Sequence, residues 1–181
     1  MNPIFLVVGP PAVGKSTTSR ALAARYPRSV CIPVDDVRDM VVSGRVLPGA
    51  VWSDELVRQV ALARSAVAYM ALSYRRAGFA VVIDDFWDPH HPADYQSLLG
   101  QPDVHRVLLY PGQDEAHQRN LRRSGGSPAR AYIDEGIEIV YGQLDSVVPQ
   151  LVQEGWVVID TTTLSVDAAV SAILQRTAGK P

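Results

Sequence analysis

Short hydrophobic runs alternate along the chain with longer stretches of helical periodicity. The runs are brief and rich in β-branched residues, which is typical of strands buried on both faces of a sheet. We expect strands at Ile4–Val8, Ser29–Val34, Ala80–Asp84, Val104–Leu109 and Trp156–Ile159. Because helical stretches separate these runs, the pattern predicts right-handed crossovers and a parallel sheet with helices on both faces.

The stretch from Trp52 to about Gly78 carries the clearest helical pattern. Ser53 is expected to cap its N-terminus. Its apolar residues recur at spacings of three and four and form one stripe, namely Leu56, Val60, Ala63, Val67, Met70 and Tyr74. Two further helices are expected, one with Ser127 as cap and Pro128 as first residue, and one that starts at Ser165.

Composition narrows the class of protein. The chain has 47% hydrophobic and 20% charged residues, so we expect one globular domain over residues 1–181. No apolar run is long enough to span a bilayer, and the first residues lack the basic segment of a secretory signal. The single cysteine, Cys31, cannot form an internal disulfide, so nothing in the sequence points to an oxidising compartment. Together these observations predict a cytoplasmic protein with no membrane partner. A net charge of −2 argues against a protein that coats long nucleic acids.

The positively charged residues are almost all arginine, and the only lysines are Lys15 and Lys180. Lys15 lies in a GxxxxGK[ST] motif that directly follows the first expected strand and precedes a helix expected over Thr18–Tyr26. The backbone N–H groups of such a phosphate loop (P-loop) hold phosphate oxygens, its lysine reaches the β- and γ-phosphates, and its serine ligates Mg²⁺. We therefore expect a nucleotide-binding set of Gly9, Pro10, Ala12, Val13, Gly14, Lys15, Ser16 and Thr17.

Several classes of P-loop protein are disfavoured by what the sequence lacks. A GTPase needs an Asn-Lys-x-Asp segment, and no second internal lysine exists to supply it. A transporter-type ATPase carries an LSGGQ-like signature, which Ser124-Gly125-Gly126-Ser127 resembles only superficially. An oligomeric AAA motor is larger than this chain. Of the P-loop classes considered, the sequence is compatible with a small phosphotransferase.

Acidic residues follow two of the expected strands. Asp35 comes first in Asp35-Asp36-Val37-Arg38, and an aspartate there can accept the proton of an acceptor hydroxyl. Arg38 lies one helical turn away and can hold an anionic acceptor or the migrating phosphoryl group. Asp36 is the alternative base, and an ordinary helix N-cap is the alternative role for either aspartate.

The third strand ends in Asp84-Asp85, which suits a carboxylate that steadies Mg²⁺ beside Ser16. Since side chains alternate along a strand, only one of the two aspartates is expected on the P-loop side, and either assignment is open.

An arginine-rich segment is expected to form a mobile helical lid over residues 113–131. Arg119 and Arg123 lie one turn apart and can share a face, and Gly125-Gly126 can act as a hinge. The alternative is a solvated helix face. Thr161 follows the last strand, and its backbone is expected either to contact adenine or only to form the turn before the final helix.

The motifs together resemble the small P-loop kinases, a group that includes chloramphenicol phosphotransferase, gluconate kinase and polynucleotide 5′-hydroxyl kinase domains. The resemblance spans roughly residues 4–175, although only the P-loop is highly specific. It implies a three-layer α/β/α sandwich with a five-stranded parallel sheet and a small helical lid. It also implies ATP, Mg²⁺ and phosphoryl transfer to a hydroxyl. The carried-over roles are phosphate and metal binding for Lys15 and Ser16, base for Asp35, acceptor binding for Arg38 and lid arginines for Arg119 and Arg123.

The acceptor is expected to bind against residues 36–78. Val41, Val42, Val46, Leu47, Val51 and Trp52 make this segment rather apolar, which favours a small-molecule hydroxyl acceptor. The spacing of Asp35 and Arg38 favours instead the 5′-hydroxyl end of a nucleic acid. A nucleotide-dependent switch or slow ATPase without an acceptor is the third hypothesis, although it leaves Asp35 and the lid without a role.

Overall fold

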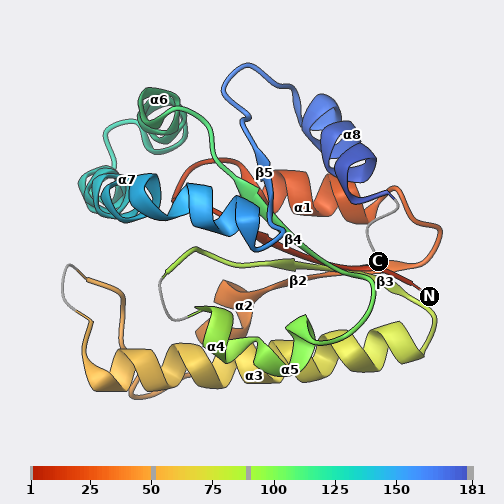
Figure 1. Ribbon diagram of the computed structural model, residues 1–181. Helices are drawn as coiled ribbons and strands as arrows, with labels where there is room; N and C mark the ends of the chain where they lie inside the picture. The colour runs from red at the N-terminus through yellow and green to blue at the C-terminus, as the bar shows by residue number, and fades with distance from the viewer. Residues whose placement is uncertain (1, 50–51, 89–90, 179–181) are drawn as a thin grey trace.

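A five-stranded parallel sheet forms the middle of three layers, with helices on both faces (Figure 1). This computed structural model describes residues 2–49, 52–88 and 91–178. The strand order is β2-β3-β1-β4-β5. The elements in chain order are β1 (Ile4–Val8), α1 (Lys15–Ala23), β2 (Ser29–Pro33), α2 (Val34–Asp39), α3 (Asp54–Arg76), β3 (Ala80–Asp84), α4 (His91–Asp94), α5 (Gln96–Leu99), β4 (Val104–Leu109), α6 (Gln113–Ser124), α7 (Ala129–Gln153), β5 (Val157–Ile159) and α8 (Val166–Thr177).

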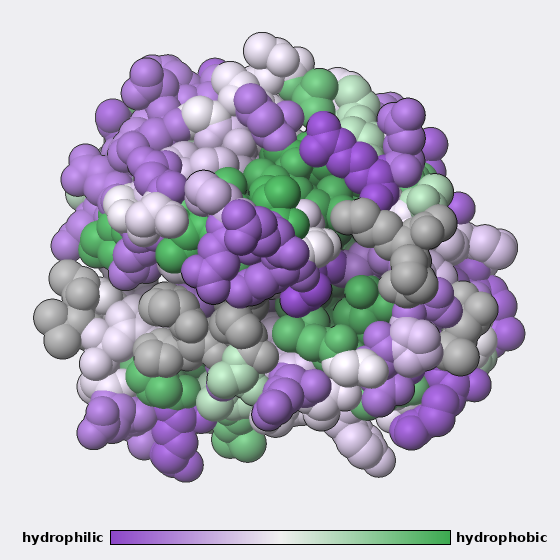
Figure 2. All heavy atoms as spheres, in the orientation of Figure 1, coloured by the Kyte–Doolittle hydropathy of each residue, from purple (hydrophilic) through white to green (hydrophobic). Residues whose placement is uncertain are grey.

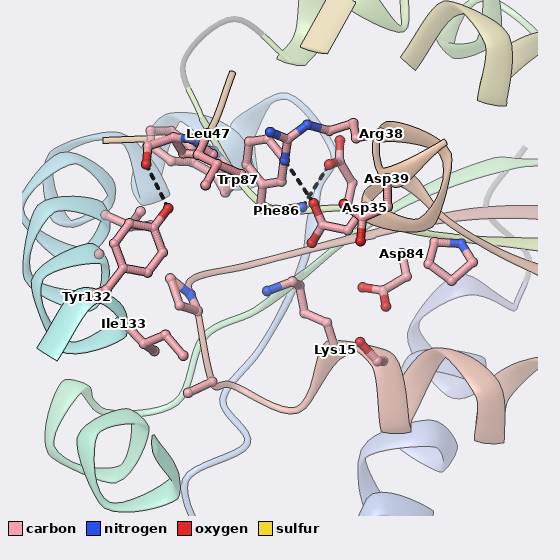
Figure 3. A pocket seen from close by; sticks show the side chains of 18 of the residues that line it. Lys15, Asp35, Arg38, Asp39, Leu47, Asp84, Phe86, Trp87, Tyr132 and Ile133 are labelled. Carbon is pink, nitrogen blue, oxygen red and sulfur yellow. Dashed lines mark hydrogen bonds and ion pairs between the residues drawn. The ribbon is translucent and has the colours of Figure 1, made fainter. Parts of the chain in front are cut away.

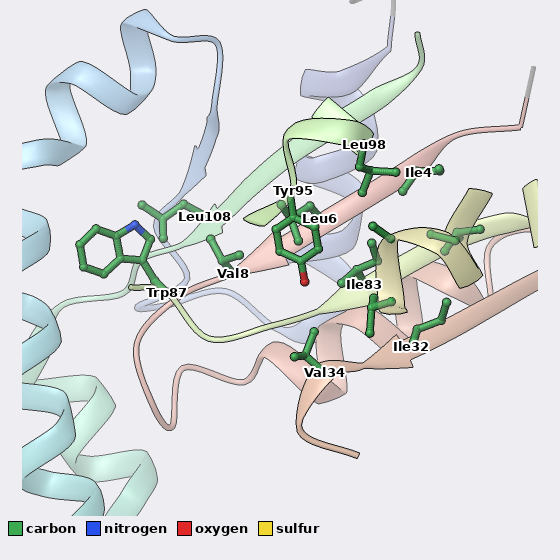
Figure 4. Close-up of a cluster of buried hydrophobic side chains, with 14 of the residues drawn as sticks. Ile4, Leu6, Val8, Ile32, Val34, Ile83, Trp87, Tyr95, Leu98 and Leu108 are labelled. Carbon is green, nitrogen blue, oxygen red and sulfur yellow. The ribbon is translucent and has the colours of Figure 1, made fainter. Parts of the chain in front are cut away.

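The central strand β1 is buried on both faces and separates two hydrophobic clusters. Ile4, Leu6 and Val8 pack on the side of α3, where Tyr95 and Leu98 of the α4–α5 segment also lie (Figure 4). Phe5 and Val7 pack on the side of α1 and α8. The alternation follows from the period of two along a strand, and the run is continuous because helices cover both faces.

The expected five strands are confirmed, with small differences at two ends. The second strand ends at Pro33 and not at Val34, because Val34 already begins α2. The last strand begins at Val157 and not at Trp156. The expected helix over Thr18–Tyr26 begins earlier, at Lys15, and ends at Ala23. The P-loop therefore leads directly into the first turn of α1.

The expected caps agree with the structure at two helices and differ at a third. The side-chain oxygens of Ser53 and Ser165 accept hydrogen bonds from the backbone N–H groups of Leu56 and Ala168. In contrast, α7 begins at Ala129 with Pro128, not Ser127, in the cap position. The stripe on α3 is also shorter than expected. Tyr74 is 39% exposed and packs edge-on against the ring of Phe79.

The segment expected to be a lid forms α6 and the start of α7, which pack against each other. Asn120 is fully buried between them and donates hydrogen bonds to the carbonyl oxygen of Arg130 and the side chain of Asp134. Gly125 ends α6 with a φ of 52°. Closure of this segment over a nucleotide stays a prediction. No helix among the described residues has the length and hydrophobicity that crossing a membrane requires.

Candidate active site

The P-loop joins β1 to α1 at the carboxyl edge of the sheet. Gly9 passes so close to β4 that an added Cβ would lie 2.5 Å from the carbonyl oxygen of Leu109. Gly14, with a φ of 91°, is the N-cap of α1, and Ala12 also adopts a left-handed conformation. This leaves the first N–H groups of α1 pointing out of the helix, where they can bind an anion.

Lys15 is half-buried within this loop, and its Nζ donates a hydrogen bond to the carbonyl oxygen of Pro10 at 2.7 Å. Burial lowers its pKa, while the nearby carboxylates of Asp84 and Asp35 act in the opposite direction. An ammonium group that is hydrogen-bonded to a main-chain carbonyl is well placed to exchange that partner for phosphate oxygens. The loop therefore fits a bound nucleotide. Of the other expected contacts, Val13 is buried and the Thr17 side chain is exposed.

The two aspartates after β3 have different surroundings. Burial raises the pKa of Asp84, whereas the ammonium of Lys15 and the hydroxyl of Ser16 favour its charged form. Asp84 therefore faces the P-loop. Asp85 is 2% exposed, and its carboxylate accepts hydrogen bonds from Nε of Arg64 at 2.7 Å and from the hydroxyl of Tyr95 at 3.2 Å. This geometry selects Asp84 as the metal candidate and gives Asp85 an ion-pairing role instead.

Among the described residues, no group of three His, Cys, Asp or Glu side chains is placed to hold a metal ion by itself. A Mg²⁺ ion at Ser16 and Asp84 would thus share most of its ligands with the nucleotide and water, as is usual for this ion.

Arg64, in the middle of α3, is completely buried and forms ion pairs with three aspartates. Besides Asp85, it contacts Asp88 at 2.5 Å and Asp94 at 2.9 Å. Burial alone would lower the pKa of Arg64, but Asp85 and Asp88 hold it above the ordinary value. The guanidinium also lies over the ring of Phe86, 4.9 Å from its centroid. The sequence pattern did not predict a role for Arg64. It shows a charged side chain beside the apolar stripe of the helix but gives no sign of the three aspartates that surround it.

On α2, Asp35 and Arg38 form an ion pair with an Nη1–Oδ1 distance of 3.0 Å. The Arg38 side chain is mostly buried against Phe86, with its guanidinium 5.5 Å from the ring centroid. Asp35 lies near enough to Lys15 to influence its pKa, whereas Asp36 influences that of Cys31. The structure therefore brings Asp35, rather than Asp36, toward the P-loop.

The two expected lid arginines have different partners. Arg119 is fixed, since its guanidinium donates to the carbonyl oxygens of Val13 at 2.9 Å and Thr161 at 2.6 Å, and to Glu115 at 2.9 Å. It thus ties the P-loop to the end of β5, where Thr161 is buried. Arg123 lines the cavity beside the P-loop and contributes to the lowered pKa of Lys15.

A cavity of about 620 Å³ lies between the P-loop, α2, residues 45–49, Trp52 and α7. Figure 3 shows Lys15, Asp35 and Asp84 toward one end of it, with Tyr132 and Ile133 of α7 at the other. The hydroxyl of Tyr132 donates to the carbonyl oxygen of Pro48 at 2.7 Å and joins the two walls.

Part of the expected acceptor segment lines this cavity. Leu47 and Trp52 contribute, whereas Val41 and Val42 do not, and Val42 is 99% exposed. Val46 is not among the lining residues either, and Val51 lies outside the described residues. Sequence reasoning missed Phe86, Trp87 and Tyr132, which come from the loop after β3 and from α7. On the face seen in Figure 2, hydrophobic side chains gather in patches within a largely hydrophilic surface.

The chain is similar in sequence or in structure to several known proteins. A family model described as an AAA domain (AAA_33) matches residues 4–135. The comparison with curated proteins gives no match. Among solved structures, the tunicamycin resistance protein of Deinococcus radiodurans is 20% identical with a TM-score of 0.68, covering 98% of this chain and 96% of that one.

Two kinases are similar over the same length. Shikimate kinase from Acinetobacter baumannii, solved in complex with shikimate, is 20% identical with a TM-score of 0.67, covering 97% of this chain and 92% of that one. A gluconokinase from Sinorhizobium meliloti 1021 is 16% identical with a TM-score of 0.62, covering 97% of this chain and 91% of that one. The chain therefore belongs to the AAA-domain family matched over residues 4–135, and its fold is that of the small P-loop kinases.

Proposed function

We propose that this protein is an ATP-dependent kinase that transfers the γ-phosphoryl group of ATP to a hydroxyl of a small molecule. The observation that carries the proposal is the cavity that opens from the P-loop onto Asp35. Lys15 and Asp84 lie at its phosphate end, and an acceptor-sized space lies beyond. A nucleotide-dependent switch or an ATPase without an acceptor requires neither the acceptor-sized space nor the carboxylate of Asp35.

In the proposed reaction the acceptor oxygen forms a bond to the γ-phosphorus, and the bond from that phosphorus to the β,γ-bridging oxygen breaks. Asp35 accepts the proton that the hydroxyl loses, and ADP leaves. Lys15 and Arg123 stabilise the charge on the phosphoryl oxygens during transfer. Mg²⁺, held at Ser16 and Asp84, would neutralise phosphate charge and orient the phosphates.

The roles of the other site residues follow from their contacts. Arg38 pairs with Asp35 at 3.0 Å, so it fixes the direction in which the carboxylate points. Arg119 holds the P-loop against the end of β5, and we expect the nucleotide base to lie near Arg119 and Thr161.

The test compares Asp35→Asn with Asp36→Asn, two equal changes at neighbouring positions. We expect Asp35→Asn to retain ATP binding but to lose phosphoryl transfer by ~10²-fold or more, because the general base is gone. Asp36→Asn should stay within a few-fold of the unaltered protein. Transfer of label from γ-labelled ATP to a panel of hydroxyl compounds, together with calorimetric ATP binding, measures both. The reverse pattern would make Asp36 the base, and equal activity in both variants would contradict a role for either.

A nucleic-acid 5′-hydroxyl end is the second candidate acceptor, favoured by the Asp35–Arg38 pair. A 5′-hydroxyl oligonucleotide therefore belongs in the same panel. Label on the oligonucleotide and on no small molecule would replace the leading proposal with an end kinase.

A further inference from the structure

The charged groups of the cavity are divided between its two ends. The P-loop end has three cationic side chains, of Lys15, Arg20 and Arg123, together with the carboxylates of Asp84 and Asp85. We define the acceptor wall as the lining residues from α2, from residues 45–49 and from α7, with Trp52, Phe86 and Trp87. This wall, counted with Asp35 where it borders the P-loop end, carries the carboxylates of Asp35, Asp36, Asp39 and Glu135 but only two guanidiniums, those of Arg38 and Arg45.

Both guanidiniums of the acceptor wall already have carboxylate partners. Arg38 pairs with Asp35 at 3.0 Å, and Arg45 pairs with Asp39. The two other carboxylates, those of Asp36 and Glu135, take part in no ion pair among the described residues. An acceptor with its own negative charge would thus meet, on the described part of the acceptor wall, more carboxylates than guanidiniums and no guanidinium without a carboxylate partner.

The rest of the acceptor wall combines four aromatic rings with aliphatic side chains such as Leu47, Ile133 and Ile139. Trp52 and Phe86 meet edge to face, with centroids 6.1 Å apart, and Trp87 and Tyr132 also line the cavity. Phe86 is held by two guanidiniums, of Arg38 on one helix and the buried Arg64 on another. Fixed rings of this kind favour flat apolar bodies, because offset and edge-to-face contacts add to the burial of hydrophobic surface.

We infer that the acceptor is a hydroxyl compound with a flat apolar body and no negative charge. The inference rests on the proposed function, and it deepens that function by naming the class of acceptor. Carboxylate-bearing acceptors and phosphate-bearing nucleic-acid ends are disfavoured by the acceptor wall. Neutral and positively charged aromatic alcohols fit it.

The test uses three benzylic alcohols that share the ring and the hydroxymethyl group and carry para substituents of different charge. They are 4-(hydroxymethyl)benzamide, 4-(aminomethyl)benzyl alcohol and 4-(hydroxymethyl)benzoate, which are neutral, positive and negative at pH 7.5. Gluconate, shikimate and a 5′-hydroxyl oligonucleotide complete the set. Binding to the full chain with Mg²⁺ and ADP is measured by ligand-observed NMR, and phosphoryl transfer from labelled ATP is measured separately.

Charge variants of the acceptor wall provide the second arm. Asp39→Asn releases Arg45 from its partner, and Glu135→Gln removes a carboxylate that has no ion pair. We expect each variant to shift the ratio of benzoate to benzamide binding toward the benzoate by about fivefold. Asp54→Asn removes an exposed carboxylate outside the cavity and should leave this ratio unchanged.

Binding of the amide and the amine but not of the benzoate, with the expected shift in the variants, supports the inference. Equal or stronger binding of the benzoate, gluconate, shikimate or the oligonucleotide overturns it. Failure of all three benzylic alcohols to bind at millimolar concentration also overturns it. Absence of phosphoryl transfer to every compound would instead count against the proposed function, since the binding measurements do not depend on transfer.

Discussion

Lys15 shows how the environment of one residue sets the chemistry of the P-loop. Its half-buried ammonium is hydrogen-bonded to the carbonyl oxygen of Pro10, and Asp84 and Asp35 lie near enough to influence its pKa. Burial disfavours the charged form, while the two carboxylates favour it. The protonated form of Lys15 is thus less stable than that of an exposed lysine. A bound phosphate would stabilise this form.

The lowered pKa of Lys15 predicts how ATP affinity depends on pH. Only the protonated lysine binds phosphate well, and its pKa in the free protein lies below the ordinary 10.5. ATP affinity should therefore fall as the pH rises from 7.5 to 10, at most about tenfold per unit. Calorimetric titration across this range measures the slope. In Lys15→Arg the guanidinium stays charged, so affinity should be weaker at pH 7.5 but nearly constant. The same slope in both proteins would contradict the prediction.

At the scale of elements, Arg64 connects α3 to the loop that follows β3. Its guanidinium reaches Asp85 at the end of the strand, Asp94 at the end of α4 and the carbonyl oxygen of Phe86. The same group lies over the Phe86 ring, which in turn supports Arg38 on α2. Helix α3 therefore fixes the position of the cavity wall although none of its own residues lines the cavity.

Replacement of Arg64 should destabilise the protein strongly. Arg64→Met would leave the carboxylates of Asp85 and Asp88 buried without a cation, at a cost of about 3–5 kcal/mol in the free energy of unfolding. Urea denaturation at pH 7 measures the loss. Arg58→Met, on the same helix, removes an exposed pair with Glu55 and should leave the denaturation midpoint unchanged. Equal effects of the two substitutions would show that the buried cluster is not needed.

The same variant has a predicted pH signature. Burial raises the pKa of Asp85 to about 6, above the 3.8 of an unperturbed aspartate, so the folded state takes up its proton more readily than the unfolded chain does. The contribution of this group to stability therefore increases as the pH falls from about 6 to 4. Part of the unfolding free energy that Arg64→Met loses at pH 7 should therefore be recovered at pH 5. Adding Asp85→Asn to Arg64→Met should remove this recovery, because no carboxyl group is left at position 85 to take up the proton.

Sequence patterns predicted the elements well because strands and helices here follow local rules. The five strands are continuous apolar runs, and Ser53 and Ser165 cap helices where expected. Contacts between distant segments could not be read in this way. The partners of Arg64 lie 21 to 30 residues away, and Arg119 reaches Val13 across 106 residues. The choice between Asp84 and Asp85 depended on that buried arginine.

At the scale of the whole molecule, the sheet brings the P-loop, Asp35 and Asp84 to one edge. The order β2-β3-β1-β4-β5 places β3 between β1 and β2, so the residues that follow these three strands meet at the P-loop. The sequence predicted a parallel sheet and the resemblance implied five strands, and both are confirmed. The ring-lined acceptor wall was only partly foreseen, since α7 contributes Tyr132 from a position about 80 residues after Trp52.

Nucleotide binding at this edge should stabilise the entire fold. A ligand at 100 times its dissociation constant adds about 2.7 kcal/mol to the free energy of unfolding. For a chain of 181 residues this corresponds to a rise in Tm of about 5–10 °C. Thermal unfolding with and without Mg²⁺ and ATP measures the shift. Lys15→Ala should fold but show little of it, and a full shift in that variant would mean that ATP binds elsewhere.

Some side chains of the acceptor wall are far more exposed to solvent than the metal candidate at the phosphate end. Leu47 and Tyr132 are 64% and 52% exposed, whereas Asp84 is 6% exposed and lies at the end of a buried strand. Surface substitutions away from buried networks usually change stability little. Over evolutionary time, descendants of this protein can therefore acquire new acceptors through changes at such positions, while selection for stable folding continues to preserve the apparatus that handles the phosphate.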